Sequence, residues 1–396
     1  MTSKSKKQPI IVWLEIFLKK NYDFRYNVVL ERIEFKGKKE KEFQLLKEYD
    51  LNSIFRVISK KGFKTNIGTL MNILNSDFTP KYDPFLSYLD SLPSYEDDKD
   101  YIKELADTVK TTNDKLWHKC LKKWLIALVG SLVDEKTINH TVLVFCSGQG
   151  KGKTSWVLRL VPEKLKHYVF TGNINPANKD ALIQLNQCMI INLDELEALN
   201  KGQINDLKEM ITKAEIRVRK AYGRFNESLI RRASFCGSVN EKEFLSDTTG
   251  NRRFLSFNTL EIDYSHDVNM DMVFAQALHL YRSNYKFWFD EKDIAEITEN
   301  NREFEKRTMD EELLLTYFTP CKKEEAKTFL TTTDIASWIA ERRNFTINEA
   351  SKQRLGKALN KNKFQRVKKD GRYVYALKIK PLTETVKIAD AKDEPK

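Results

Sequence analysis

One stretch of the sequence restricts the possible folds more than any other. An apolar run at 141–146 leads into a glycine-rich loop, and Lys153, Thr154 and Ser155 follow directly. Glycines let backbone N–H groups point inward, where the side chains of other residues would block a phosphate. A helix that begins near Lys153 would direct the positive end of its dipole at the same place. We therefore predict a strand, a phosphate-binding loop and a helix, in this order.

The residue types of this loop predict a site for ATP and Mg²⁺. Lys153 would neutralise charge on the β- and γ-phosphates, and the Thr154 hydroxyl would be a ligand of Mg²⁺. We expect ATP to be contacted by Ser147, Gly148, Gln149, Gly150, Lys151, Gly152, Lys153, Thr154 and Ser155. Ser147 stands where the usual pattern G-x-x-x-x-G-K-[ST] has glycine. Serine is compatible with this position if its φ is negative, and otherwise the loop starts one residue later.

Two later apolar runs also end in polar residues. The run at 189–193 is followed by Asp194 and Glu195, and the run at 233–239 is followed by Asn240. At the edge of a parallel sheet, Asp194 would hold Mg²⁺ through water while Glu195 polarises the attacking water. Asn240 could sense the γ-phosphate and orient that water. An asparagine that merely begins a turn would stand in the same place.

A pair of adjacent arginines, Arg252 and Arg253, lies in a polar turn before a further apolar run. These arginines could simply be surface charge. A guanidinium fork is also the group that a neighbouring subunit would insert to stabilise phosphoryl transfer. The sequence leaves both interpretations open.

The pattern of apolar residues divides the chain into four parts. Residues 1–135 look mainly helical, and in 136–265 short apolar strands alternate with helices. This alternation predicts an α/β domain with a largely parallel sheet and helices on its faces. Residues 266–318 read as a helical extension. Two helices and a hairpin in 319–396 have the outline of a winged helix, and they end in a loose charged tail.

Composition restricts the kinds of binding partner and the cellular compartment that we expect. The chain has 68 Lys and Arg against 56 Asp and Glu, a formal net charge of +12, which suits nucleic acid. Many basic proteins bind no polyanion, so charge alone does not decide. The five cysteines are scattered singly, which favours a reduced, cytoplasmic protein without structural zinc. The longest apolar run, at 124–133, is too short to cross a bilayer, and the start lacks the features of a secretory signal.

The ordered set of motifs resembles the virulence-associated protein E family, which is allied to superfamily 3 and poxvirus-type primase-helicases among the AAA+ ATPases. The matching segments are 147–155, 191–195, 237–240 and 247–254, with 82–92 as a helical lead-in. The similarity extends over roughly residues 80–260. The resemblance implies an AAA+ P-loop ATPase core. It also implies a DNA helicase or translocase that forms a ring, with a hexamer as the expected form and ATP sites between subunits.

The resemblance further implies a role in replicating a mobile element such as a plasmid, satellite or phage. Asn240 would then be the sensor, and Arg252 or Arg253 the finger that reaches the next subunit. In similar helicases the interval before Asn240 carries a pore loop that grips single-stranded DNA. The candidates there, four cations and a base-stacking aromatic ring, are Lys213, Arg217, Arg219, Lys220 and Tyr222. A solvated edge hairpin with protective charges would look the same.

Other assignments also remain open. The C-terminal segment could bind duplex DNA or a protein, and a separate primase would supply primers, because residues 1–135 carry no recognisable primase constellation. An ATP-gated DNA-binding initiator without unwinding activity is one rival function. A P-loop regulator of a defence system is another. A G protein is disfavoured, since the sequence has no Asn-Lys-x-Asp segment.

Overall fold

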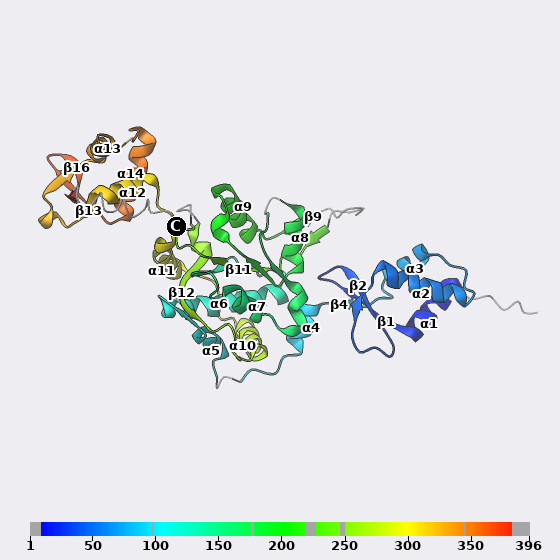
Figure 1. The fold of residues 1–396 in the computed structure, drawn as a ribbon. Coiled ribbons are helices and arrows are strands. Elements are labelled where there is room, and N and C mark those ends of the chain that lie inside the picture. Colours follow the sequence, from blue (N-terminus) through cyan, green and yellow to red (C-terminus); the bar gives the residue numbers. More distant parts are fainter. Residues whose placement is uncertain are drawn as a thin grey trace, which may run out of the picture. The chain divides into compact units, whose positions relative to one another are not determined.

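The computed structural model describes residues 9–96, 99–175, 178–218, 227–245, 250–343 and 345–381. The chain divides into two compact units, Met1–Glu305 and Lys306–Lys396. Figure 1 labels their helices and strands along the chain. Among the described residues, no helix combines the length and the apolar character that crossing a membrane requires.

A six-stranded sheet forms the centre of the first unit, with the strand order β5-β12-β6-β11-β8-β7. Its strands are β5 (Val109–Thr111), β6 (Val142–Cys146), β7 (Val169–Thr171), β8 (Ile190–Leu193), β11 (Ser234–Val239) and β12 (Phe254–Ile262). The five strands from β12 to β7 pair in parallel, and β5 pairs antiparallel with β12. Both β6 and β11 are buried at every position, as expected for central strands covered on both faces. The predicted α/β architecture with a largely parallel sheet is therefore confirmed.

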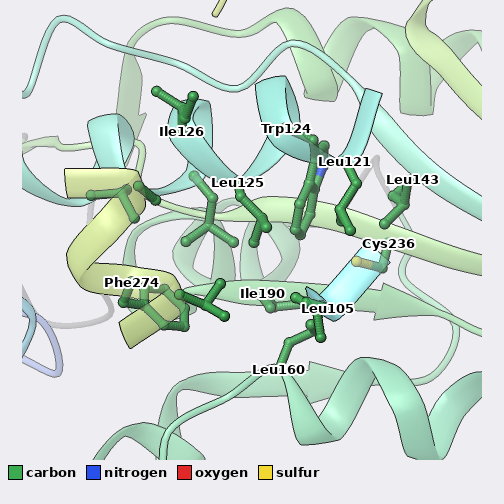
Figure 2. Close-up of a cluster of buried hydrophobic side chains, with 14 of the residues drawn as sticks. Leu105, Leu121, Trp124, Leu125, Ile126, Leu143, Leu160, Ile190, Cys236 and Phe274 are labelled. Atoms are coloured by element: carbon green, nitrogen blue, oxygen red, sulfur yellow. The ribbon is translucent and has the colours of Figure 1, made fainter. Parts of the chain in front are cut away.

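Helices cover both faces of this sheet. One face packs against α4 (Pro84–Asp90), α5 (Tyr101–Asp107), α6 (Asp114–Val133), α7 (Lys153–Arg159), α10 (Met270–Arg282) and α11 (Glu291–Asn301). The other face packs against α8 (Lys179–Gln187) and α9 (Lys201–Thr212). Alternate residues of β6 enter the two cores, because successive side chains of a strand point to opposite faces. In Figure 2, Trp124 of α6 and Phe274 of α10 belong to the same cluster as Leu143, Ile190 and Cys236 of the sheet.

The N-terminal part of this unit has a small core of its own. It contains the helices α1 (Ile10–Asn21), α2 (Glu48–Lys60) and α3 (Ile67–Leu74) and a sheet of order β3-β2-β1-β4. The strands are β1 (Tyr22–Asn27), β2 (Arg32–Gly37), β3 (Gln44–Leu45) and β4 (Lys81–Tyr82). The sequence predicted helices here but missed the sheet. Its strands β1 and β2 do alternate apolar and polar residues. Phe24 faces Phe35 in the core, and Arg25 faces Glu34 with 2.5 Å between Nε and Oε2. This alternation is a signal that could have revealed the sheet.

The second unit contains the two helices and the hairpin that the sequence predicted. They are α13 (Thr332–Ala340), α14 (Glu349–Lys361), β15 (Gln365–Lys369) and β16 (Arg372–Ile379). Asp370 and Gly371 join the two strands with φ values of 49° and 75°, as a two-residue hairpin turn requires. The structure adds α12 (Met309–Tyr317), β13 (Phe318–Pro320) and β14 (Thr328–Leu330), and the last two pair with β16.

Short elements complete the described chain. They are the strands β9 (Ile216–Val218) and β10 (Glu227–Leu229) and the 3₁₀ helices η1 (Glu163–Tyr168), η2 (Leu196–Ala198), η3 (Asn251–Arg253), η4 (Arg302–Phe304) and η5 (Lys323–Glu325). Two of them matter for the site, because η2 follows β8 after Asp194 and Glu195, and η3 leads directly into β12.

Candidate functional site

Three polar segments meet at the carboxyl edge of the central sheet. The glycine-rich loop follows β6, Asn240 follows β11, and Asp194 follows β8. These three strands are parallel neighbours in the sheet, so their ends lie side by side. Ligand sites of open parallel sheets form at this edge. The strand order therefore brings together segments that are far apart in the sequence.

The loop has the backbone that its sequence pattern requires. Gly150 and Gly152 have φ values of 76° and 81°, whereas Ser147 is not among the described residues with positive φ. Serine at position 147 is thus compatible with the pattern. A Cβ at Gly152 would lie 2.2 Å from Cδ1 of Tyr264, so this tyrosine ring packs directly against the loop. A Cβ placed on Gly148 or on Gly150 would have no described atom within 4 Å, which leaves room beside the loop.

Lys153 is held inside the loop by three oxygen acceptors. Its Nζ donates to the carbonyl oxygens of Ser147 and Gly148 at 2.6 and 3.1 Å, and to Asn240 Oδ1 at 3.1 Å. Only 7% of the residue is exposed. Burial lowers the pKa of Lys153 below its usual value, and nearby negative groups, Glu197 and Asp194 among them, partly oppose this effect. A buried ammonium group whose hydrogen-bond acceptors are neutral would be stabilised more strongly by a negatively charged phosphate.

Thr154 and Asp194 form the candidate metal site. Thr154 Oγ1 donates to Asp194 Oδ1 at 3.1 Å, and this oxygen also accepts from Asn192 Nδ2 at 3.1 Å and Ser238 Oγ at 3.2 Å. A hydroxyl and an oriented carboxylate are the hard oxygen ligands that Mg²⁺ prefers. The structure thus joins the two predicted ligands. The sequence prediction missed the supporting Asn192 and Ser238, although polar residues inside fully buried strands are a signal that could have revealed them.

The acidic residues after β8 differ in their surroundings. Glu195 has a φ of 56° and is exposed, and its side chain forms no hydrogen bond or ion pair within the described chain. Glu197, on η2, accepts a hydrogen bond from the backbone N–H of Asn240 at 2.9 Å. Its other oxygen, Oε2, is buried without a partner among the described residues. Sequence reasoning did not select Glu197, because only the fold brings it to Asn240.

These groups are compatible with a nucleotide and its metal ion. The loop offers open space beside two glycines, and the buried Ser147 hydroxyl has no partner among the described residues. Lys153 could hold phosphate, and Thr154 with Asp194 could hold Mg²⁺. The remaining predicted contacts, Gln149, Lys151 and Ser155, are exposed at the same edge.

Arg252 and Arg253 lie at the opposite edge of the sheet. They form part of η3, and β12 then begins at Phe254, which pairs with Val142, the first residue of β6. The glycine-rich loop follows the other end of β6, about 16 Å away along the strand. The structure therefore does not bring these arginines to the loop of their own chain. They line a cavity of about 380 Å³ together with His140 and Trp288.

The same amino edge holds a buried arginine. Arg231, shortly before β11, is 1% exposed, and none of its side-chain nitrogens has a hydrogen-bond partner in the described chain. Burial lowers the pKa of Arg231 to about 9. Burial also lowers the pKa of His140, and the positive charges of Arg231 and Arg253 lower it further. The edge that carries the arginine pair is thus electropositive.

The predicted DNA-contacting residues are only partly described. Lys213 directly follows α9, and Arg217 lies in β9, which pairs antiparallel with β10. Arg219, Lys220 and Tyr222 lie outside the described residues.

Fold and site together define an α/β protein whose mainly parallel sheet carries a glycine-rich loop, a buried lysine and an oriented aspartate at its carboxyl edge. The chain belongs to the virulence-associated protein E-like domain family, whose model matches residues 89–306, more than half of its 396 residues. This match covers the loop, Asp194, Asn240 and the arginine pair, and it confirms the resemblance read from the motifs.

The chain is also similar to solved structures of the C-terminal region of NrS-1. An apo structure of that region is 14% identical, with 94% of this chain and 100% of that chain covered and a TM-score of 0.46. An A-form apo structure is also 14% identical, with 93% and 99% covered and a TM-score of 0.46. No curated protein matches the chain.

Proposed function

We propose that this protein is an ATP-dependent DNA helicase or translocase that serves the replication of a mobile genetic element. The observation that carries the proposal is the convergence of Lys153, Thr154, Asp194 and Asn240 around a glycine-rich loop at one sheet edge. Membership of the virulence-associated protein E-like domain family supports the assignment. In this proposal the six-stranded domain is an AAA+ P-loop ATPase core.

Each residue of the edge has a task in the proposed hydrolysis. Lys153 and the loop N–H groups bind the β- and γ-phosphates, and Thr154 and Asp194 hold Mg²⁺, which supplies charge neutralisation when bound. Glu195 activates the attacking water. A phosphate would give Lys153 a better acceptor than Asn240 Oδ1, which it now contacts at 3.1 Å. The Asn240 amide would then be free to orient the water.

The proposed active unit is a ring, with a hexamer as the expected form. Arg252 and Arg253 precede β12 at the amino edge, a strand length away from their own loop. Arginines placed there can complete the site of a neighbouring copy, where a guanidinium stabilises charge in phosphoryl transfer. This geometry supports ATP sites between subunits.

We further propose single-stranded DNA as the ligand of the ring channel. The net charge of +12 favours a polyanion, and the candidate contacts are Lys213, Arg217, Arg219, Lys220 and Tyr222. The unit Lys306–Lys396, with its helices and hairpin, would be a winged-helix-like module for duplex DNA. A separate primase would supply primers, and the setting would be cytoplasmic.

The test is ATP hydrolysis with and without single-stranded DNA. Lys153→Ala should reduce the rate at least about 100-fold, because it removes charge stabilisation at the phosphates. Lys164→Ala removes an exposed lysine outside the site and should leave the rate unchanged. The wild type should be stimulated by DNA and should separate strands. Hydrolysis that ignores DNA would contradict the translocase and favour the ATP-gated initiator, and hydrolysis that survives Lys153→Ala would contradict the site itself.

A further inference from the structure

Two hydrogen bonds link Glu197 to the lysine of the loop. Glu197 Oε1 accepts from the backbone N–H of Asn240 at 2.9 Å. The Asn240 side chain, through Oδ1, accepts from Lys153 Nζ at 3.1 Å. Glu197 therefore holds the backbone of Asn240, and the side chain of Asn240 in turn contacts Lys153.

Asn240 needs such support because the sheet no longer holds it. The strand β11 ends at Val239, and Asn240 is exposed. Its N–H thus lies beyond the hydrogen-bonded ladder, and without Glu197 it would bond to water. A residue released in this way regains backbone freedom, and its side chain loses a defined position relative to Lys153.

Close packing places Glu197 for this contact. The 3₁₀ helix η2, on which it lies, packs against β11 where Gly237 leaves space. A Cβ at Gly237 would lie 2.3 Å from Cδ1 of Leu196. Leu196 is 1% exposed, so the residue before Glu197 is anchored in the core. The carboxylate is consequently presented to Asn240 by a fixed backbone.

We propose that Glu197 is a positioning residue for ATP hydrolysis, which fixes Asn240 at the end of β11 so that its amide can orient the attacking water. The inference rests on the proposed function and deepens it. The inference assigns different roles to the two glutamates after β8, Glu195 and Glu197. Glu195 is exposed and has no side-chain partner within the described chain, so it is available to water. Glu197 is half-buried and bonded to the backbone.

The test compares Glu197→Ala and Glu197→Gln in the full-length protein. Glu197→Ala should lower kcat about 10- to 100-fold, because misplacing a group that orients a reactant has effects of this size. The affinity for ATP should stay within about threefold, since the phosphate-binding groups are intact. Glu197→Gln keeps an acceptor oxygen and should recover most of the rate. Glu241→Ala, an exposed carboxylate next to Asn240, is the control and should leave kcat unchanged.

Combination with Asn240→Ala decides whether Glu197 acts through Asn240. The double variant Glu197→Ala/Asn240→Ala should be no slower than Asn240→Ala alone, because residues that act as a unit are not additive. Additive losses would overturn the inference, and so would equal losses in Glu197→Gln and Glu197→Ala. If Glu197→Ala fails to fold, Glu197→Leu, which keeps most of the side-chain volume but has no acceptor oxygen, replaces it in the same comparison with and without Asn240→Ala.

Failure of this inference is distinguishable from failure of the proposed function. Hydrolysis that depends on Lys153 but is unchanged in Glu197→Ala would contradict only the role of Glu197. Hydrolysis that is absent, or insensitive to Lys153→Ala, would contradict the proposed function and the inference with it.

Discussion

At the scale of single residues, Gly152 shows how little the loop can change. Its φ is 81°, and a Cβ would meet the Tyr264 ring at 2.2 Å. We predict that Gly152→Ala lowers the free energy of unfolding by about 1–3 kcal/mol, from the left-handed backbone and the steric overlap together. Urea denaturation measures the loss.

Gly148→Ala is the matched control for this prediction. Gly148 is absent from the described residues with positive φ, and a Cβ placed on it would have no described atom within 4 Å. Its substitution should change stability by no more than about 0.5 kcal/mol. Adding Tyr264→Ala to Gly152→Ala should restore part of the stability. Equal losses in the two glycine variants would show that neither φ nor Tyr264 matters.

Arg231 supports a second prediction at this scale. Its guanidinium is fully buried without a hydrogen-bond partner in the described chain, and it lies over the Phe235 ring at 5.4 Å from the ring centroid. A ring face compensates only part of the cost of burying a charge. Arg231→Met keeps a similar volume without the charge and should raise the free energy of unfolding by at least about 1 kcal/mol. Arg231→Lys retains a charge and should bring no gain. A large loss in Arg231→Met would contradict a net cost of burying this charge.

At the scale of elements, the end of α11 holds the arginine turn. Asn301 is 1% exposed, and its Nδ2 donates to the carbonyl oxygens of Asn251 and Phe254 at 2.8 and 2.7 Å. These two carbonyls lie on either side of the arginine pair. Asn301→Leu leaves them without this donor, and we predict that it lowers DNA-stimulated ATP hydrolysis while ATP binding is retained. Parallel binding and turnover assays separate the two effects.

Asn300→Leu provides the comparison for this element. Asn300 Nδ2 donates to the Ser256 carbonyl oxygen at 2.7 Å, so it also bonds to β12 but not to the arginine turn. Both variants lose an amide donor to the backbone, with a cost of about 1–3 kcal/mol each. Only Asn301→Leu should slow hydrolysis beyond its effect on stability. The same loss of turnover in both would contradict a specific role for Asn301.

At the scale of the whole molecule, the two sheet edges carry complementary halves of the proposed site. Lys153→Ala chains lack the loop lysine, and Arg252→Ala/Arg253→Ala chains lack the arginine pair. We predict that each is inactive alone and that a mixture recovers ATP hydrolysis. In mixed rings an intact loop can face an intact arginine pair across an interface. Hydrolysis rates over a range of mixing ratios measure the recovery.

The mixing experiment has a clear control. A mixture of Lys153→Ala with Lys153→Ala/Arg252→Ala/Arg253→Ala contains no intact loop and should stay inactive at every ratio. No recovery in the first mixture would contradict sites that are shared between subunits. Full activity of the arginine variant on its own would contradict a role for the pair in hydrolysis.

The sequence by itself determined the local features of the candidate site. Buried runs identified β6, β8 and β11, because central parallel strands are apolar throughout. The glycine spacing identified the loop, since only glycine readily adopts the positive φ seen at positions 150 and 152. The polar residues at strand ends pointed to Asp194 and Asn240. Each of these signals depends on residues that are neighbours in the chain.

Tertiary structure decided what depends on residues far apart in the sequence. The order of strands put Asp194 and Asn240 beside the loop and the arginine pair at the opposite edge. The contact of Glu197 with Asn240 arises because η2 packs on β11 at Gly237. The N-terminal sheet was missed although β1 and β2 alternate apolar and polar residues, because the pairing of such short strands depends on the core that they share with α1, α2 and α3. Strand order and side-chain partners depend on how the whole sheet is buried between its helices, and this cannot be predicted from patterns of residues that are neighbours in the sequence.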